Sequence, residues 1–384
     1  MAVTMEILEP FKEGIDAVRD TGGGAFKYCY QCGMCDTVCP WNRVRQFSMR
    51  QIVRQATFGI PEIEGEDIWR CTTCGYCAQR CPRGVETINV TVSLRCIASE
   101  YGAVPGTIHT VSASLGTEGN PMREERKNRA NWTAGLNVKE FTEGTEILYF
   151  PGCYPSYDSR LKKVAIATAK ILSAAGVDFG ILGTKEVCCG ESIRKAGDEE
   201  LFKQLARENI KNFIDAGVKK ILVSSPHCYH TFKNEYTEFK TNFEVIHISQ
   251  FLYELIKEGR LNIKKELPGK ITYHDPCYLG RHNGIYEEPR GVLMKVPGLE
   301  LAEMADCRQE SLCCGGGGGG IWMDRKKGER FADLRTQQAI ETGARLLVTA
   351  CPYCIVNFED SRLTLENPEV IEIKDITEII SEVI

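Results

Sequence analysis

Long apolar runs are missing from this sequence of 384 residues. Every apolar stretch is interrupted by a charged residue well before the ~18 residues that a membrane-spanning helix needs. The opening residues, MAVTMEILEPFKEG, also lack the apolar core of a secretory signal peptide. The sequence therefore predicts a soluble, cytoplasmic protein without a membrane span.

Blocks of like charge are missing as well. The 47 Lys and Arg residues are interspersed with 52 Asp and Glu residues, which gives a formal net charge of −5. Binding to nucleic acid or to an anionic lipid surface needs a concentrated basic field, and no segment of the sequence supplies one. We therefore expect no nucleic acid and no membrane among the partners.

A nucleotide-binding motif is the third absence. No Gly-x-Gly-x-x-Gly follows a predicted strand, so the chain itself is not expected to bind nicotinamide or flavin. The glycine run 315–320 is not followed by the Gly-Lys-Ser/Thr of a phosphate-binding loop. Because glycine carries no side chain, we expect this run to let a bulky cofactor or substrate approach the backbone.

Cysteine is the residue in excess, with 19 copies. A secreted protein could use this many in disulfides, but this chain has no export signal and its thiols cluster at two- and three-residue gaps. The pattern is typical of proteins that use cysteine for metal binding or redox chemistry.

The cysteines also divide the chain into parts. Residues 1–100 hold nine of them, and residues 101–145 hold none and have the polar, glycine-rich composition of a connector. The remaining cysteines fall into two similar copies, which predicts domains at 146–265 and 266–384.

Offsets between equivalent cysteines support this repeat. They are 124, 125 and 126 residues for the pairs Cys153 and Cys277, Cys188 and Cys313, and Cys228 and Cys354. Each copy alternates strand-like and helix-like segments; predicted strands are 147–153, 177–182, 220–225, 270–277, 299–304 and 345–350, and predicted helices include 158–175, 198–216, 286–296 and 324–342. The alternation favours parallel sheets flanked by helices, with cysteines at the carboxyl ends of strands. The fold class is therefore α/β, or α+β overall when a helical first domain is included.

The first part contains two matching runs of four cysteines. They are Cys29-x2-Cys32-x2-Cys35-x3-Cys39-Pro40 and Cys71-x2-Cys74-x2-Cys77-x3-Cys81-Pro82. This is the bacterial ferredoxin spacing, in which the fourth cysteine of each run binds the other 4Fe-4S cubane. The rule assigns Cys29, Cys32, Cys35 and Cys81 to one cubane, and Cys71, Cys74, Cys77 and Cys39 to the other. Two structural zinc sites are the alternative, which the duplicated Cys-Pro endings disfavour. Predicted helices at 43–55 and 85–100 flank the runs, and Cys96 lies outside them as an expected inert, buried thiol.

The two later copies differ by one thiol. The second copy has five candidate catalytic cysteines: Cys277, Cys313, Cys314, Cys351 and Cys354. Five exceeds the four that a cubane or zinc uses, so we expect a larger, bridged or open cluster there. The first copy has four candidate metal ligands, Cys153, Cys188, Cys189 and Cys228, and Ser225 replaces the fifth. His227 lies beside this gap and is the histidine we single out as a candidate ligand, whereas Cys307 belongs to no motif and is expected to be structural.

These motifs resemble a known family. The two Cys-Cys-Gly copies resemble the CCG domains of the heterodisulfide reductase family, and the ferredoxin-like part resembles the dicluster domain found fused to them. Iron-sulfur subunits of glycolate oxidase and electron-transfer-flavoprotein:quinone oxidoreductases share this order. The resemblance covers residues 25–100 and 146–365. It implies noncubane 4Fe-4S clusters in one or both CCG domains, at which a disulfide can be cleaved, and it leaves a noncubane cluster, a cubane, zinc or nothing open for the first.

We therefore predict an iron-sulfur oxidoreductase subunit of heterodisulfide reductase type. Electrons would pass from the two cubanes to the CCG clusters, in electron transport of anaerobic metabolism, within a hetero-oligomeric complex that contains a flavin-bearing subunit. The alternative is a non-catalytic relay subunit of a larger flavin-containing complex, such as one driving low-potential aromatic reduction or exchanging electrons with a flavoprotein. A third alternative is a redox-sensing binding module. A thiol pair, a hydroxy acid or a partner's flavin would each suit these motifs as substrate.

Overall fold

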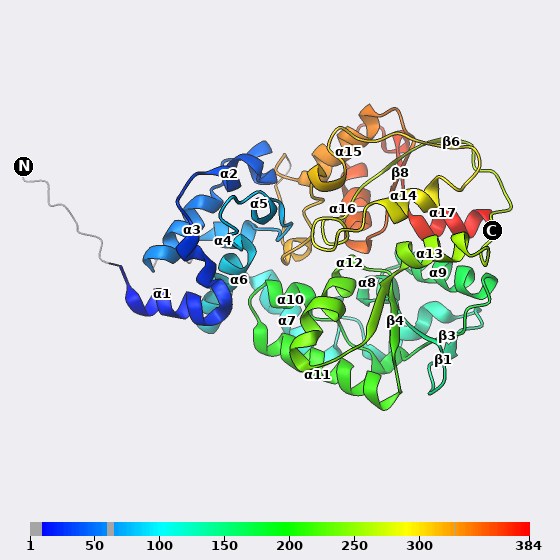
Figure 1. Cartoon of the computed structure of the whole chain (residues 1–384), viewed down its shortest axis with the longest axis horizontal. Helices are drawn as coiled ribbons and strands as arrows, with labels where there is room; N and C mark the ends of the chain where they lie inside the picture. The colour runs from blue at the N-terminus through cyan, green and yellow to red at the C-terminus, as the bar shows by residue number, and fades with distance from the viewer. Residues whose placement is uncertain (1–9, 60–64, 327) are drawn as a thin grey trace, which may run out of the picture.

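Residues 10–59, 65–326 and 328–384 are described by the computed structural model of the chain. Figure 1 shows a helical N-terminal part, blue to cyan, beside two parts that each contain a sheet, coloured mainly green and yellow to red. No helix among the described residues is long and apolar enough to cross a membrane.

Short helices build the N-terminal part. They are α1 (Lys12–Val18), α2 (Met34–Val38), α3 (Met49–Phe58), α4 (Glu66–Arg70), α5 (Tyr76–Gln79) and α6 (Thr87–Glu100), with turns η1 (Arg19–Gly23), η2 (Gly24–Tyr28) and η3 (Pro40–Arg43). The helix predicted at 43–55 starts later than predicted and is α3, Met49–Phe58. It begins at Met49 because the Ser48 side chain caps it by accepting a hydrogen bond from the Gln51 amide at 3.1 Å. The helix predicted at 85–100 is confirmed as α6.

The first module contains a parallel sheet of five strands in the order β1-β3-β2-β4-β5. Its strands are β1 (Lys139–Glu140), β2 (Ile147–Phe150), β3 (Phe179–Ile181), β4 (Lys220–Val223) and β5 (Glu244–His247), and its helices are α8 (Cys153–Tyr157), α9 (Lys162–Ala174), α10 (Glu191–Lys195), α11 (Glu199–Asp215), α12 (Pro226–His230) and α13 (Ile248–Lys257), with turns η6 (Gly183–Lys185), η7 (Thr231–Glu235) and η8 (Tyr236–Phe239). All four residues of β2 are buried, as expected for a central strand covered on both faces.

The second module repeats the arrangement with four parallel strands in the order β7-β6-β8-β9. They are β6 (Gly269–Tyr273), β7 (Leu299–Leu301), β8 (Leu346–Thr349) and β9 (Glu372–Asp375), with helices α14 (Glu287–Leu293), α15 (Phe331–Glu341), α16 (Pro352–Arg362) and α17 (Ile376–Val383) and turns η9 (Arg308–Glu310), η10 (Gly320–Trp322) and η11 (Pro368–Val370). In the first module β2 lies between β3 and β4, as β6 lies between β7 and β8 in the second, so the predicted repeat and parallel sheets are confirmed. The helix predicted from residue 324 begins at Phe331, since Gly328 has a φ of 87° that a right-handed helix cannot include.

Residues 101–145 are more than a linker, although composition predicted only a connector. They form α7 (Gly106–Glu118) and η5 (Arg126–Thr133), and then β1, which pairs with β3 of the first module. The polar composition was misleading because this segment still buries large side chains, among them Trp132 and Arg129. The predicted domain boundaries stay predictions.

The two modules pack against each other through helices and one arginine. In Figure 1, α17 of the second module lies beside α9 of the first. Arg160 of the first module donates hydrogen bonds to Glu378 at 2.9 Å and to Glu359 at 3.0 Å, both in the second. These contacts hold the two modules against each other.

Candidate functional site

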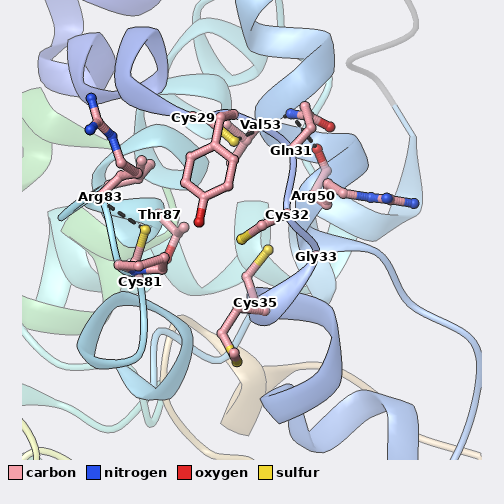
Figure 2. Close-up of a pocket in the computed structure, with 14 residues that line it drawn as sticks. Cys29, Gln31, Cys32, Gly33, Cys35, Arg50, Val53, Cys81, Arg83 and Thr87 are labelled. Carbon is pink, nitrogen blue, oxygen red and sulfur yellow. Dashed lines mark hydrogen bonds between the residues drawn. The ribbon is translucent and has the colours of Figure 1, made fainter.

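The first group of cysteines lines one pocket in the helical part. Cys29, Cys32, Cys35 and Cys81, here called set one, all contribute to its wall. Figure 2 shows Cys32 and Cys35 on one side of the pocket and Cys81, from the second run, on the other. Gly33 has a φ of 83° and lets the loop turn sharply between Cys32 and α2. The structure thus brings together the four residues predicted to share a cluster.

The second group is buried more deeply. Cys71, Cys74 and Cys77 are buried, and Cys39 comes from the first run to join them as set two. Burial and the thiols of Cys74 and Cys77 raise the pKa of Cys39 above its usual range. Cys81 lines the pocket of set one, as the predicted exchange of the fourth cysteine requires, and the place of Cys39 in set two stays a prediction.

Both sets have the donor chemistry of an iron-sulfur site. Burial, with the thiols of Cys71 and Cys74, raises the pKa of Cys77 to about 12. Burial also raises the pKa of Cys35 to about 12. Thiols so crowded hold their protons unless a metal ion compensates the thiolate charge, and soft sulfur donors suit iron-sulfur clusters. The residues present fit two 4Fe-4S clusters.

Set two touches the second module directly. The Thr72 hydroxyl lies 3.7 Å from the Cys313 sulfur, and the Cys313 thiol, together with burial, raises the pKa of the neighbouring Cys74 well above its usual range. Arg281, from the second module, donates to the Cys74 carbonyl at 2.8 Å. The helical part and the second module are therefore in direct contact between set two and the cysteines of the second module.

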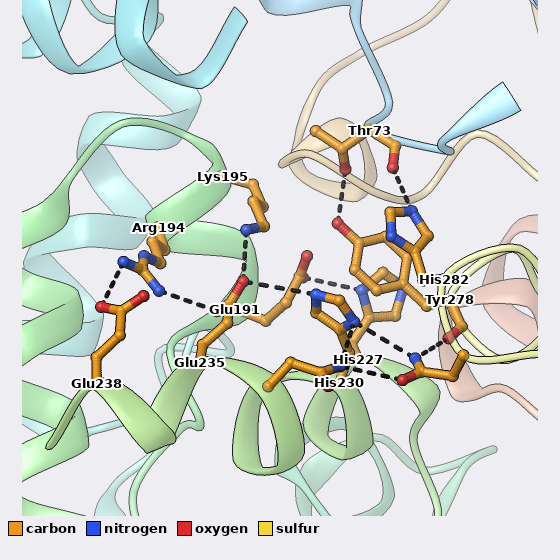
Figure 3. A network of polar contacts seen from close by, with 12 residues as sticks. Thr73, Glu191, Arg194, Lys195, His227, His230, Glu235, Glu238, Tyr278 and His282 are labelled. Carbon is orange, nitrogen blue, oxygen red and sulfur yellow. Dashed lines mark hydrogen bonds and ion pairs between the residues drawn. The ribbon is translucent and has the colours of Figure 1, made fainter. Parts of the chain in front are cut away.

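Thr73 is held from the second module as well. Its carbonyl lies 2.9 Å from the His282 ring nitrogen, and its hydroxyl lies 2.8 Å from the Tyr278 hydroxyl. Figure 3 shows Tyr278 and His282 together below Thr73. Thr73 has a φ of 50°, a left-handed conformation that a threonine rarely adopts and that these two contacts help to hold.

Arg95 joins all three parts of the chain. This fully buried side chain on α6 donates hydrogen bonds to four carbonyls: those of Ile68 at 2.8 Å, Cys71 at 2.6 Å, Lys195 at 2.8 Å and Gly318 at 2.8 Å. Ile68 and Cys71 lie in the helical part, Lys195 in the first module and Gly318 in the second. Sequence reasoning missed Arg95, because an arginine in a helix is most often a surface residue.

The glycine run packs against the loop of set two. A Cβ atom at Gly317 would lie 2.4 Å from the Thr72 carbonyl oxygen, and one at Gly318 would lie 2.6 Å from the Cys71 carbonyl oxygen. At these two positions the missing side chains make room for the backbone of a neighbouring loop, whereas the sequence suggested room for a cofactor or a substrate. The contacts of Gly317 and Gly318 are to the backbone of the loop that bears Cys71 and Cys74.

The second module gathers all five of its predicted cysteines, here called the second-module set. The Cys277 and Cys313 sulfurs lie 4.0 Å apart, and the Cys314 and Cys354 sulfurs lie 3.3 Å apart. Cys351 packs in the same buried cluster as Cys314 and Cys354. Each of the five side chains is at most 7% exposed, so the set forms a buried sulfur-lined site at the carboxyl end of β6 and β8.

The first module gathers its four cysteines in the corresponding place, as the first-module set. All four are buried, and the neighbouring Cys188 thiol, together with burial, raises the pKa of Cys153 well above its usual range. Arg129, from the supposed connector, lies 3.6 Å from the Cys153 sulfur and pairs with buried Glu186 at 3.2 Å. A fixed positive charge therefore lies beside this set, a feature that composition did not reveal.

His227 does not fill the gap left at Ser225. Its Nδ1 atom lies 2.8 Å from a carboxylate oxygen of Glu191, and despite the burial of the ring, this carboxylate and the Cys351 thiol of the other module raise the pKa of the imidazole. The ring stacks on Tyr278 with 4.1 Å between centroids. Figure 3 shows His227 and Glu191 beside Tyr278. His227 thus lies between the modules and faces the second-module set.

One pocket reaches the second-module set from outside. It lies between the helical part and the second module, and its wall includes Cys314, Gly315, Asn357, Arg325 and Trp41. Asn357 donates a hydrogen bond to Tyr353 and lies 3.7 Å from the Cys314 sulfur. The two remaining cysteines lie apart from these sets: Cys96 is buried on α6 and Cys307 is half-buried.

Comparisons with known proteins agree with this geometry. A model of the cysteine-rich CCG domain matches residues 147–233 and 271–359, and a model of the 4Fe-4S dicluster domain matches residues 25–85. These matches cover the helical part and both modules, in the order that the cysteine spacing predicted.

Three relatives show how far the similarity extends. The chain is 38% identical over 330 residues to the probable iron-sulfur-binding oxidoreductase FadF of Bacillus subtilis, covering 83% of this chain and 47% of that protein. It is 37% identical over 333 residues to the EtfAB:quinone oxidoreductase of Syntrophomonas wolfei, covering 83% and 46%. It is 33% identical over 388 residues to one subunit of the dihydromethanophenazine:CoB–CoM heterodisulfide reductase of Methanosarcina mazei, covering 92% and 93%.

This chain spans about half the length of the first two relatives and nearly all of the third. The shared part is an iron-sulfur unit that occurs in several redox proteins. The chain belongs to the family of iron-sulfur oxidoreductases that join a 4Fe-4S dicluster domain to two cysteine-rich CCG domains, a family that includes this heterodisulfide reductase component.

Proposed function

We propose that the chain is a cytoplasmic oxidoreductase subunit of heterodisulfide reductase type. Set one and set two would each hold a 4Fe-4S cubane, and the second-module set would hold a noncubane cluster at which a disulfide is reduced. The observation that carries this proposal is the contact between the loop of set two and the second-module set, where the Thr72 hydroxyl lies 3.7 Å from the Cys313 sulfur. When bound, the clusters supply one-electron redox chemistry, and the protein fixes their separation and surroundings.

The chain's own residues support a defined order of sites. Set one lines a pocket with partly exposed cysteines, where a donor can approach, whereas Cys71, Cys74 and Cys77 of set two are buried. Arg281, His282 and Tyr278 hold the loop of set two against the second module. This order favours electron uptake at set one and delivery to the second module.

The second module has the features that a substrate site needs. It has a fifth thiol, Cys351, where the first module has Ser225. The pocket whose wall includes Cys314 gives a thiol or disulfide a route to the set. The first-module set, with four thiols beside Arg129, would hold a cluster or zinc and serve the structure or the relay.

A partner is required for turnover in this proposal. The relatives named as a heterodisulfide reductase subunit and as an EtfAB:quinone oxidoreductase favour a complex with other redox subunits. Because the sequence contains no nucleotide-binding motif, one of these subunits would contain the flavin. The second relative also favours an alternative, a non-catalytic relay that exchanges electrons with a flavoprotein. Disulfide reduction by the isolated, loaded chain with an artificial donor distinguishes the two, because only the catalytic hypothesis predicts it.

Iron content provides the first test. Two cubanes and at least one cluster in a CCG module predict about twelve iron atoms or more per chain, four for each cluster. The measurement is iron and sulfide per chain after anoxic purification and full reconstitution. Eight iron atoms or fewer would mean that only the dicluster domain holds clusters, and the proposed site in the second module would fail.

Set one and set two provide the second test. Replacing Cys32 or Cys74 with alanine removes one thiolate of four, so reduction by the natural donor should fall by about 100-fold or more, since even the partners of metal ligands typically cost 10–100-fold. A small chemical reductant should still reduce the second-module cluster, as followed by its electron paramagnetic resonance signal. Cys96→Ala, at a buried cysteine outside the sets, is the matched control. Undiminished turnover with the natural donor in either variant would contradict this route.

A further inference from the structure

We propose that His274 donates a hydrogen bond to the sulfur atoms of the second-module set and does not bind the metal there. The proposal goes beyond the disulfide chemistry, and it rests only on the second module holding a cluster. The iron assay tests that condition separately.

The position of His274 is fixed by its surroundings. It follows β6 directly and is fully buried. Its backbone amide donates to the Val348 carbonyl at 2.9 Å, and its ring packs edge-on against Phe358 with 4.8 Å between centroids. One ring nitrogen and the sulfurs of Cys314 and Cys354 all lie within 4.8 Å of one another. The imidazole is therefore a close neighbour of two candidate ligands.

Arg335 decides which ring nitrogen carries the proton. Its Nε atom donates to His274 Nδ1 at 3.1 Å, and a guanidinium can only donate. Nδ1 must then be the unprotonated acceptor, so that the neutral ring carries its hydrogen on Nε2. A protonated Nε2 has no lone pair to offer iron, which excludes coordination through that atom.

Arg335 is itself held in this orientation. The buried guanidinium also donates to the Asp306 carbonyl at 2.6 Å, to the Gln338 side chain at 2.8 Å and to the Ser311 hydroxyl at 3.2 Å. Because these bonds engage both terminal nitrogens of the guanidinium, it cannot rotate away from His274 without breaking them. The tautomer of the histidine is therefore set by the fold.

The Nε2 atom of His274 needs an acceptor. It is buried and has no hydrogen-bond partner among the described residues. A buried N–H group is rarely left unpaired, and the nearby groups best able to accept its hydrogen are the sulfurs of the second-module set. Electron-rich thiolate or cluster sulfur is a stronger acceptor than a thiol, so the bond would form when the site is loaded.

The first module lacks this donor. Phe150 stands three residues before Cys153, as His274 stands three residues before Cys277. A hydrogen bond to sulfur stabilises the more negative, reduced form of an iron-sulfur site and so raises its reduction potential. His274 would therefore make the second module, and not the first, the favoured place for electrons to collect.

Two variants of His274 test this role. His274→Leu removes the donor and should shift the potential of the second-module signal to a more negative value with iron per chain unchanged. His274→Gln places an amide N–H near the position of Nε2 and should recover much of the shift. The measurement is a redox titration followed by electron paramagnetic resonance, with the dicluster signals as internal references. Loss of about one cluster of iron in His274→Leu would indicate a metal ligand and would overturn the proposal, as would an unchanged potential.

A matched control and a second measurement complete the test. Phe150→Leu alters the equivalent buried ring of the first module and should leave the second-module potential unchanged. If His274→Leu does not fold, protein labelled with ¹⁵N-histidine answers the question directly. A weak hyperfine coupling that is lost in His274→Gln supports a hydrogen bond to sulfur. A strong coupling from directly bound nitrogen, or no coupling that depends on His274, overturns it.

Discussion

Replacing Cys354 with serine should abolish disulfide reduction and leave the signals of set one and set two intact. The Cys354 sulfur lies 3.3 Å from that of Cys314, is 2% exposed and comes from the first turn of α16. A serine hydroxyl is a harder and poorer ligand for iron than a thiolate. We expect a loss of about 100-fold or more in turnover, measured with an artificial donor and a small disulfide.

The first module supplies the matched controls. Cys228 corresponds to Cys354, and Cys228→Ser should disturb the first-module metal while substrate reduction persists. Ser225→Ala should be mild, within about 0.5 kcal/mol in stability, because the Ser225 side chain does not cap α12. If Cys228→Ser abolished reduction and Cys354→Ser did not, the chemistry would belong to the first module. If both variants turned over normally with the partner complex, the chain would be a relay without its own substrate.

Spacing along the chain was enough to predict the cysteine sets. Cys29, Cys32 and Cys35 lie in one short loop, so their convergence follows from local geometry. The contribution of Cys81 to the same pocket was also predicted, because the ferredoxin spacing relates both runs. The parallel sheets followed from buried strand-like runs alternating with helices, and β2 and β6 bear this out.

Contacts between distant segments could not be read from the sequence. Arg95 binds carbonyl oxygens, which every residue possesses, so no side-chain pattern marks its four acceptors. The same holds for Arg281, which binds the Cys74 carbonyl. The orientation of His227 toward Cys351 depends on how the modules face each other, and its place beside Cys228 in sequence suggested the wrong neighbour.

The two modules differ at positions whose meaning the sequence alone did not explain. The missing thiol at Ser225 was visible, whereas the exchange of His274 for Phe150 gains meaning only when Arg335 is seen to fix the imidazole. Both differences fall at the carboxyl ends of strands, where a sheet of this kind presents its ligands. They give the cysteine sets of the two modules different surroundings.

Replacing Arg95 with methionine should release the loop of set two from both modules. The change keeps an apolar stem but leaves the carbonyls of Cys71, Lys195 and Gly318 buried without their donor. Hydrogen bonds to charged groups contribute about 1.5–3 kcal/mol each and are not additive, so we expect local opening to become easier by roughly 3 kcal/mol. That corresponds to about 100-fold faster amide hydrogen exchange in residues 71–74 and 316–320.

Two further variants test whether the hydrogen bonds from Arg95 to four carbonyls are what slows hydrogen exchange in these loops. Arg95→Lys should recover little, because one ammonium cannot reach four acceptors as the planar guanidinium does. Arg207→Ala, on the exposed face of α11, is the control and should leave exchange in both loops unchanged. Because set two meets the second-module set through this loop, the magnetic interaction between their reduced clusters should weaken in Arg95→Met. Unchanged exchange in both loops would mean that Arg281 and the glycine run hold the parts together without Arg95.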